Sequence, residues 1–194
     1  MKRIVVSGLL LGILLLAAPA AAQAETKILP ETFTSDDDRL VVHYPTGWFT
    51  DTQYDGQVRI GTNEYNVDLS YDRLESGQAS VVILYAAGSR SYNSALLRGS
   101  NPLDILRYIV RSSSTTSGTS LRLDPPESIT FGDYPAARTD GYIQDNEVFL
   151  LVVNYAVDRY SLIMGYAAEG ELSLYEPKLL AIAESADYAI PSNI

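Results

Sequence analysis

A single histidine and the absence of cysteine limit the chemistry that this chain of 194 residues can support. His43 lies in a short run of valine and tyrosine residues, where a structural role is the simpler interpretation. A triad hydrolase would have to combine His43 with Ser89 or Ser91, and the spacing does not favour that combination. The sequence has no nucleophile elbow, no H-E-x-x-H motif and no phosphate-binding glycine loop. The sequence therefore favours a protein that is not an enzyme, and we assign no catalytic residue.

Carboxylates are the remaining candidates for catalysis, because the chain contains 24 aspartate and glutamate residues. A glycosidase needs only two of them at a suitable separation, so a secreted hydrolase that uses paired carboxylates is one alternative. Asp36, Asp37 and Asp38 are the candidates for a calcium site, since calcium prefers hard oxygen ligands. A solvated charge run is the simpler interpretation of this triplet. A calcium-dependent surface-binding domain is thus a second alternative, and no other cofactor is expected.

Fourteen tyrosines and one tryptophan are a further unusual feature of the composition. Aromatic rings at a surface can stack on a sugar or on another apolar ligand. Trp48 follows a Pro-Thr-Gly turn, and Tyr54, Tyr65 and Tyr92 lie in polar stretches. These four residues are the candidate ligand-binding positions, with packing at the edge of the core as the simpler role of Trp48.

Residues 1–24 have the pattern of a secretory signal peptide. Lys2 and Arg3 precede an apolar run over 4–18, and Ala-Gln-Ala at 22–24 is a cleavage signal. We expect an exported protein, periplasmic or extracellular, without stable membrane insertion after cleavage; a retained anchor is the alternative. Cleavage would remove two positive charges and change the formal net charge from −10 to −12, which disfavours nucleic acid as a partner. The partner is expected to be an unknown protein or small ligand.

The remaining chain is predicted to form a polar flexible lead-in over 25–38 and a single domain over 39–191. In 147–153 the residues on both alternating faces are apolar, which predicts a central strand covered on both sides. Asn101-Pro102 is a favourable helix start. Further strands are expected over 39–44, 57–62, 65–71, 79–86, 127–131 and 136–143, and another follows a turn near Asp158 and continues up to 169. A final helix is expected over 171–186, with Pro177 near its first turn, and an edge strand over 187–190.

Several short motifs accompany this order of elements. They are Tyr-Pro-Thr-Gly-Trp at 44–48, the Asn-Pro helix start, Phe-Gly-Asp-Tyr-Pro-Ala-Ala-Arg at 131–138, Asp-Arg-Tyr at 158–160, Tyr-Glu-Pro at 175–177 and Ser-Ala-Asp-Tyr at 185–188. The chain resembles the PsbP-like superfamily, which includes extrinsic photosystem subunits, a Ran-binding transport factor and exported bacterial proteins. The resemblance implies an α+β fold in which a curved antiparallel sheet has helices on both faces, an α/β/α sandwich. It also implies a non-catalytic accessory or binding module, and it carries over no catalytic residue, because the matching positions are turns and core residues.

Overall fold

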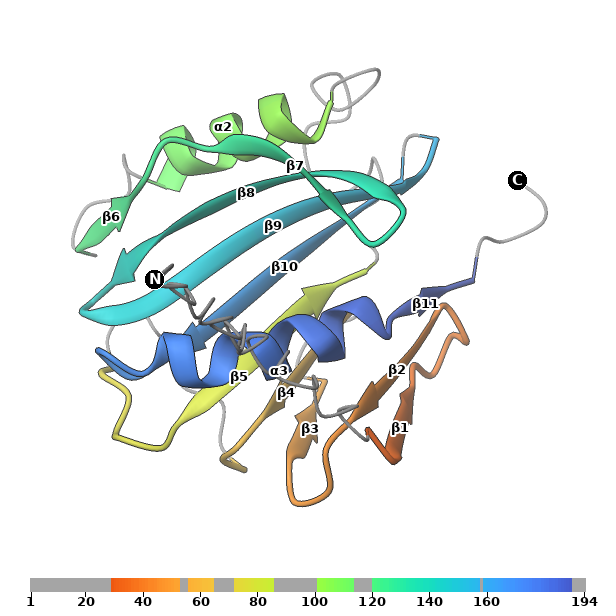
Figure 1. The fold of residues 1–194 in the computed structure, drawn as a ribbon. Helices are drawn as coiled ribbons and strands as arrows, with labels where there is room; N and C mark the ends of the chain where they lie inside the picture. Colours follow the sequence, from red (N-terminus) through yellow and green to blue (C-terminus); the bar gives the residue numbers. More distant parts are fainter. Residues whose placement is uncertain are drawn as a thin grey trace, which may run out of the picture.

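The computed structural model describes residues 29–52, 56–64, 72–85, 101–113, 120–157 and 159–189. These residues form β1 (Glu31–Thr34), β2 (Leu40–Tyr44), β3 (Phe49–Asp51), β4 (Gln57–Gly61), β5 (Ala79–Leu84), α2 (Pro102–Ser113), β6 (Leu121–Leu123), β7 (Glu127–Phe131), β8 (Tyr134–Ile143), β9 (Asn146–Ala156), β10 (Arg159–Ala167), α3 (Leu172–Glu184) and β11 (Asp187–Tyr188) (Figure 1). The larger sheet has eight strands in the order β3-β4-β5-β10-β9-β8-β6, and β7 also pairs with β8. The smaller sheet has the order β1-β2-β11. All pairings are antiparallel, which confirms the α+β class.

Strand β9 is the central strand that its sequence predicts. Every residue from Val148 to Val153 is buried, because alternate side chains enter different hydrophobic clusters. Leu151 and Val153 belong to the main core, and Leu150 and Val152 face α2. Strand β9 pairs with β8 on one side and β10 on the other. The hydrophobic run therefore accounts for the central position of this strand, whereas its register is seen in the pairing with β8 and β10.

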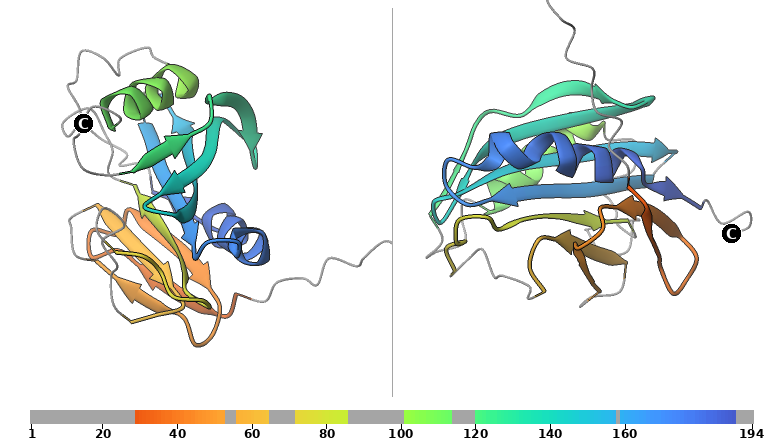
Figure 2. Two further views of the ribbon diagram at one scale, coloured as in Figure 1. Left: turned by 90° about the vertical axis from the view of Figure 1, so that its left-hand side faces the viewer. Right: turned by 60° about the horizontal axis from the view of Figure 1, so that its bottom comes forward.

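Helix α2 begins where the sequence predicts. The side-chain oxygen Oδ1 of Asn101 accepts a hydrogen bond from the backbone N–H of Asp104 at 2.9 Å, so Asn101 caps the first turn. Ile105 and Leu106 of the helix are buried in the cluster that contains Val152. The helix lies near the β8 side of the sheet (Figure 2).

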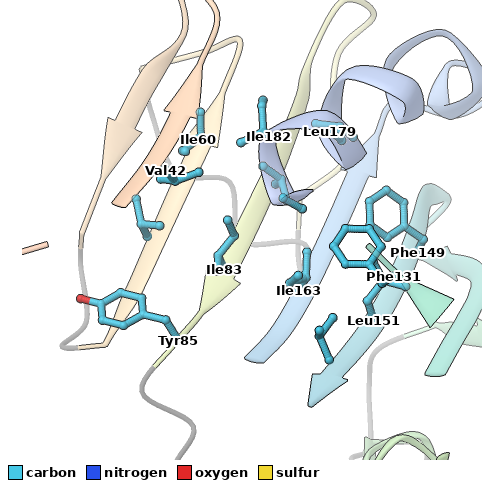
Figure 3. Close-up of a cluster of buried hydrophobic side chains, with 14 of the residues drawn as sticks. Val42, Ile60, Ile83, Tyr85, Phe131, Phe149, Leu151, Ile163, Leu179 and Ile182 are labelled. Carbon is cyan, nitrogen blue, oxygen red and sulfur yellow. The ribbon is translucent and has the colours of Figure 1, made fainter. Parts of the chain in front are cut away.

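Helix α3 runs along β5 and β10 and contributes Leu179 and Ile182 to the main core (Figure 3). Pro177 was expected near the first turn, but the helix begins at Leu172 and Pro177 lies in its second turn. A proline there leaves the carbonyl of Ser173 without its helical donor. Ser173 is exposed, so that carbonyl can bond to water.

The polar lead-in ends earlier than the sequence suggested. Residues 31–34 form β1, which pairs with β2, and Phe33 packs against the main core. The prediction of a flexible segment up to residue 38 was therefore wrong for this part, because the pairing with β2 holds these residues as an edge strand. The three-residue strands β3 and β6 were not predicted either, since three residues show no periodicity.

The other helices and strands begin and end within a few residues of the boundaries expected from the sequence. The final edge strand is β11, and the strand expected over 65–71 lies outside the described residues. Among the residues that the structure describes, no helix combines the length and the apolar character needed to cross a membrane.

Candidate functional site

An acid-lined cavity of about 290 Å³ lies between the β8–β9 strands and the first turns of α3. We call it the acid pocket. Strand β8, strand β9 and α3 each supply one carboxylate, and Asp124 in the segment before β7 supplies a fourth. The lining residues are Asp124, Asp140, Gly141, Tyr142, Glu147, Val148, Leu172, Ser173 and Glu176. None of these residues is basic.

Arg138 connects two of these carboxylates beside the pocket. Its Nη2 atom lies 2.5 Å from Oδ1 of Asp140 and 2.7 Å from Oε1 of Glu176, and its Nε atom donates to Oδ2 of Asp140 at 2.9 Å. The guanidinium also stacks on Phe149, with 5.1 Å between Cζ and the ring centroid. The hydrogen bond with Asp140, followed by that with Glu176, raises the pKa of Arg138, so this side chain remains charged. Arg138 therefore ties α3 to the sheet.

Glu147 has a structural partner as well. Its Oε2 atom accepts the backbone N–H of Leu172 at 2.8 Å, and its Oε1 atom lies 3.4 Å from the hydroxyl of Tyr142. The residue at the start of α3 provides no side-chain cap, so this carboxylate from β9 satisfies an N–H group at the positive end of the helix. By contrast, Asp124 is exposed and has no ion-pair partner among the described residues.

Asp140 and Glu176 of the acid pocket do not have the arrangement of a glycosidase pair. A glycosidase holds its two carboxyl groups apart with the substrate between them. In the acid pocket the guanidinium of Arg138 occupies the space between Asp140 and Glu176. A cationic group that enters from solvent would instead meet the free carboxylate of Asp124.

A second, smaller cavity of about 40 Å³ lies at the other end of α3, and we call it the aromatic pocket. Its lining residues are Phe131, Gly132, Tyr134, Val153, Ala183, Glu184, Ala186 and Tyr188. Tyr188 stacks on Tyr155 with 4.2 Å between the ring centroids and 8° between the ring planes. Burial raises the pKa of both hydroxyl groups.

Of the four ligand-binding residues proposed from the sequence, the structure describes Trp48, so the grouping of the four stays a prediction. Trp48 is half-buried and packs against the main core, and Nζ of Lys178 lies 5.7 Å from its ring centroid. Tyr54, Tyr65 and Tyr92 lie outside the described residues. His43 is exposed, and its Nδ1 atom lies 3.0 Å from Oγ1 of Thr32.

The aspartate triplet forms the turn between β1 and β2. Oδ1 of Asp37 accepts hydrogen bonds from the hydroxyl of Ser35 at 2.7 Å and from the backbone N–H of Arg39 at 3.2 Å. Asp38 adopts a φ of +53°, and Asp36 is exposed. These contacts hold a tight turn. Within the described ranges, no group of three or more His, Cys, Asp or Glu residues is arranged to hold a metal ion.

Sequence reasoning missed the acids of the acid pocket. Arg138 and Asp140 are two positions apart in one strand, so the period of a strand places them on the same face. Glu176 is on a helix far along the chain, and no spacing in the sequence indicates that it meets Arg138. Glu147 directly follows the turn into β9, where a solvated acid is the simpler expectation from the sequence.

No protein-family model and no curated protein matches the chain. The solution structure of the cyanobacterial PsbP (CyanoP) from Synechocystis sp. PCC 6803 is similar, with a TM-score of 0.50, 12% identity and coverage of 89% of this chain and 100% of that chain. The chain has a PsbP-like fold.

Two other solved structures are similar to this chain. A crystal structure from Bacteroides thetaiotaomicron VPI-5482 has a TM-score of 0.51 and 8% identity, and it covers 86% of this chain. The match covers 51% of that protein, so this PsbP-like chain spans about half of its length. The Saccharomyces cerevisiae Ran-binding protein Mog1p has a TM-score of 0.42 and 7% identity, and it covers 81% of this chain and 94% of that chain. The similarity to Mog1p is too low to carry a functional argument.

Proposed function

We propose that this PsbP-like protein is an exported, non-catalytic binding or accessory module that recognises cationic groups of a partner protein through the acid pocket. The observation that carries this proposal is the lining of the pocket, which has four carboxylates and no basic residue. Arg138 neutralises part of this charge from the side of the pocket, and Asp124 remains available. A lysine or arginine side chain complements such a surface in charge and in hydrogen bonding.

The architecture of the domain supports a binding role. Helices α2 and α3 pack against alternate residues of β9, which supports an α/β/α sandwich with both faces of the central strand covered. A strand that is covered in this way leaves the loops, sheet edges and grooves beside the helices for interactions. The acid pocket is such a groove, beside the first turns of α3.

The overall charge of the chain fits a basic partner. A formal net charge of −10 attracts cationic surfaces over a distance comparable to the Debye length and raises the association rate at low salt. Export is part of the proposal and rests on the signal-peptide pattern of residues 1–24.

A titration with a hexalysine peptide tests this function. We expect two-dimensional NMR spectra of the protein to show shifts concentrated at Asp124 and Ser173. Asp124→Asn should weaken binding about threefold to tenfold, and a rise from 50 to 300 mM salt should weaken binding further.

Asp36→Asn is the matched control, because it removes one charge that is also exposed, from the turn between β1 and β2. It should leave the affinity for hexalysine nearly unchanged. Equal weakening by the two variants would mean that the peptide senses only the net charge, and the acid pocket would then not be the binding site.

A further inference from the structure

Strand β7 forms an open margin of the larger sheet. It pairs with β8 on one side, and none of the described strands pairs with its other side (Figure 1). The register with β8 is regular and ends at a two-residue turn, with Phe131 opposite Tyr134 and Ile129 opposite Ala136. A further strand can therefore pair with the free margin of β7.

The register identifies the backbone groups that face this margin. The pair that closes a two-residue hairpin is hydrogen-bonded, and hydrogen-bonded pairs alternate with non-hydrogen-bonded pairs along the strands. The odd-numbered residues of β7 therefore exchange hydrogen bonds with β8, whereas Ser128 and Thr130 direct their N–H and C=O groups away from it. Pro135 lies opposite Thr130 and has no N–H to donate, which agrees with a non-hydrogen-bonded position there.

The outward backbone groups are open to solvent. Ser128 and Thr130 are exposed, and their outward N–H and C=O groups have no hydrogen-bond partner among the described residues. They offer two donors and two acceptors to an added strand. Pro125 and Pro126 directly precede β7 and have no N–H group, so they confine such pairing to β7 itself.

The side chains of β7 give the margin a chemical preference. Glu127 and Ile129 alternate along the strand and lie on one face of the sheet. Ile129 is half-buried against the main core, so part of its surface still contacts water. Glu127 is exposed and has no ion-pair partner among the described residues, and its cross-strand neighbour Arg138 pairs with Asp140 and Glu176 instead. An added strand therefore meets an apolar side chain at one position and an unpaired carboxylate two positions away.

We propose that β7 accepts an extended segment of a partner protein as an added antiparallel strand. The segment has an aliphatic residue beside Ile129 and, two positions later, a lysine or arginine beside Glu127. This order follows from antiparallel pairing, because the added chain then runs from Thr130 towards Glu127, and antiparallel ladders are the more stable kind. Cross-strand packing and charge complementarity select the two side chains. Glu127 and Ile129 lie outside the acid pocket, so this site goes beyond the proposed function.

Two peptides of identical composition test the pairing. One is acetyl-Ser-Thr-Ile-Thr-Lys-Thr-Ser-amide, and the other has the reverse order, so that lysine precedes isoleucine. Two-dimensional NMR of the isotopically labelled full chain should show shifts concentrated at Ser128 and Thr130 with the first peptide, and the exchange of these two amide protons with solvent should slow about threefold or more. The reversed peptide should bind about threefold more weakly, because antiparallel pairing would place its lysine beside Ile129. Equal affinity of the two peptides overturns the antiparallel strand.

Matched variants assign the contacts. Ser128→Pro removes one outward donor without removing a hydrogen bond to β8, so it should weaken binding of the first peptide about fivefold, whereas Ser128→Thr should not. Glu127→Lys should weaken the first peptide about threefold and strengthen a version with glutamate in place of lysine by a similar factor. Asp36→Lys makes the same change in net charge at an exposed position in the turn between β1 and β2, and it should alter neither affinity by more than about 1.5-fold. Circular dichroism verifies that each variant is folded, and Glu127→Lys tests the site even if Ser128→Pro does not fold.

The outcomes separate the β7 margin from the acid pocket. Shifts at Ser128 and Thr130 that disappear in Ser128→Pro support the added strand. Shifts at Asp124 and Ser173, with affinity lost in Asp124→Asn and kept in Ser128→Pro, would place the peptide in the acid pocket and overturn the added strand. Absence of binding by the first peptide, or insensitivity to Glu127→Lys, also overturns it. Hexalysine binding that depends on Asp124 would stand after either result, because that peptide has no aliphatic residue.

Discussion

Replacing Arg138 with methionine should loosen the attachment of α3 to the sheet. The guanidinium makes a bidentate contact with Asp140 in its own strand and bridges to Glu176 on α3 at 2.7 Å. Methionine retains much of the apolar stem that covers Phe149 but provides no donor. The substitution therefore removes the charge and leaves most of the packing.

The exposure of the Arg138 and Glu176 side chains determines how much stability this ion pair contributes. Arg138 and Glu176 are 20% and 28% exposed, so their pair lies between a surface pair worth about 0.2–1 kcal/mol and a buried pair whose disruption costs about 3–5 kcal/mol. We expect Arg138→Met to lower the free energy of unfolding by about 2–3 kcal/mol, since two carboxylates lose their charged donor. The coupling energy between Arg138 and Glu176 should be about 1–2 kcal/mol.

A double-mutant cycle measures this coupling. Urea denaturation followed by circular dichroism is carried out on the unsubstituted protein, Arg138→Met, Glu176→Gln and the double variant. The cycle of Arg39→Met and Asp37→Asn is the control, because that pair is 3.4 Å apart and its side chains are 49% and 41% exposed. The control coupling should stay below about 0.5 kcal/mol. A coupling for Arg138 and Glu176 no larger than that of the control would refute the role of this ion pair in holding α3.

Three further predictions concern the core. Val152→Asp should abolish cooperative thermal unfolding, because it places an unpaired charge at a position that is 1% exposed; a near-native melting curve would contradict the placement of the core. Gly165→Ala should cost about 1–3 kcal/mol in urea denaturation, since the new Cβ would lie 2.2 Å from the ring of Phe149, and an unchanged midpoint would show that the ring moves freely. Burial raises the pKa of Tyr188, so the unfolded chain loses this proton near its ordinary value of 10.0 before the folded chain does, and stability should fall as pH rises above that value. Tyr188→Phe removes the titrating hydroxyl, so its urea midpoint should fall less at alkaline pH; an equal fall would assign the alkaline loss to other groups.

Much of the fold was predictable because its causes are local. The continuous apolar run of β9 predicts a strand that is buried on both faces, and Asn101 with Pro102 predicts the start of α2. These patterns depend on residues within one or two turns or strand periods of one another. Strand β1 escaped prediction because its polar residues resemble the acidic turn that follows, and only its pairing with β2 makes it a strand.

The candidate site was much less predictable. The sequence directs attention to Trp48 and to the aspartate triplet. Trp48 packs against the core and Lys178, and Asp37 of the triplet holds its own turn. The sequence does not indicate the acid pocket, because Arg138 and Glu176 meet only after α3 packs against the sheet.

The sequence by itself determined the net charge, the central strand, the helix start and the scarcity of catalytic groups. These properties follow from composition, from the alternation of side chains along a strand and from capping within one helical turn. Only the tertiary structure decided which carboxylates share a pocket, because the contact between Arg138 on β8 and Glu176 on α3 depends on packing across the sheet and corresponds to no spacing in the chain.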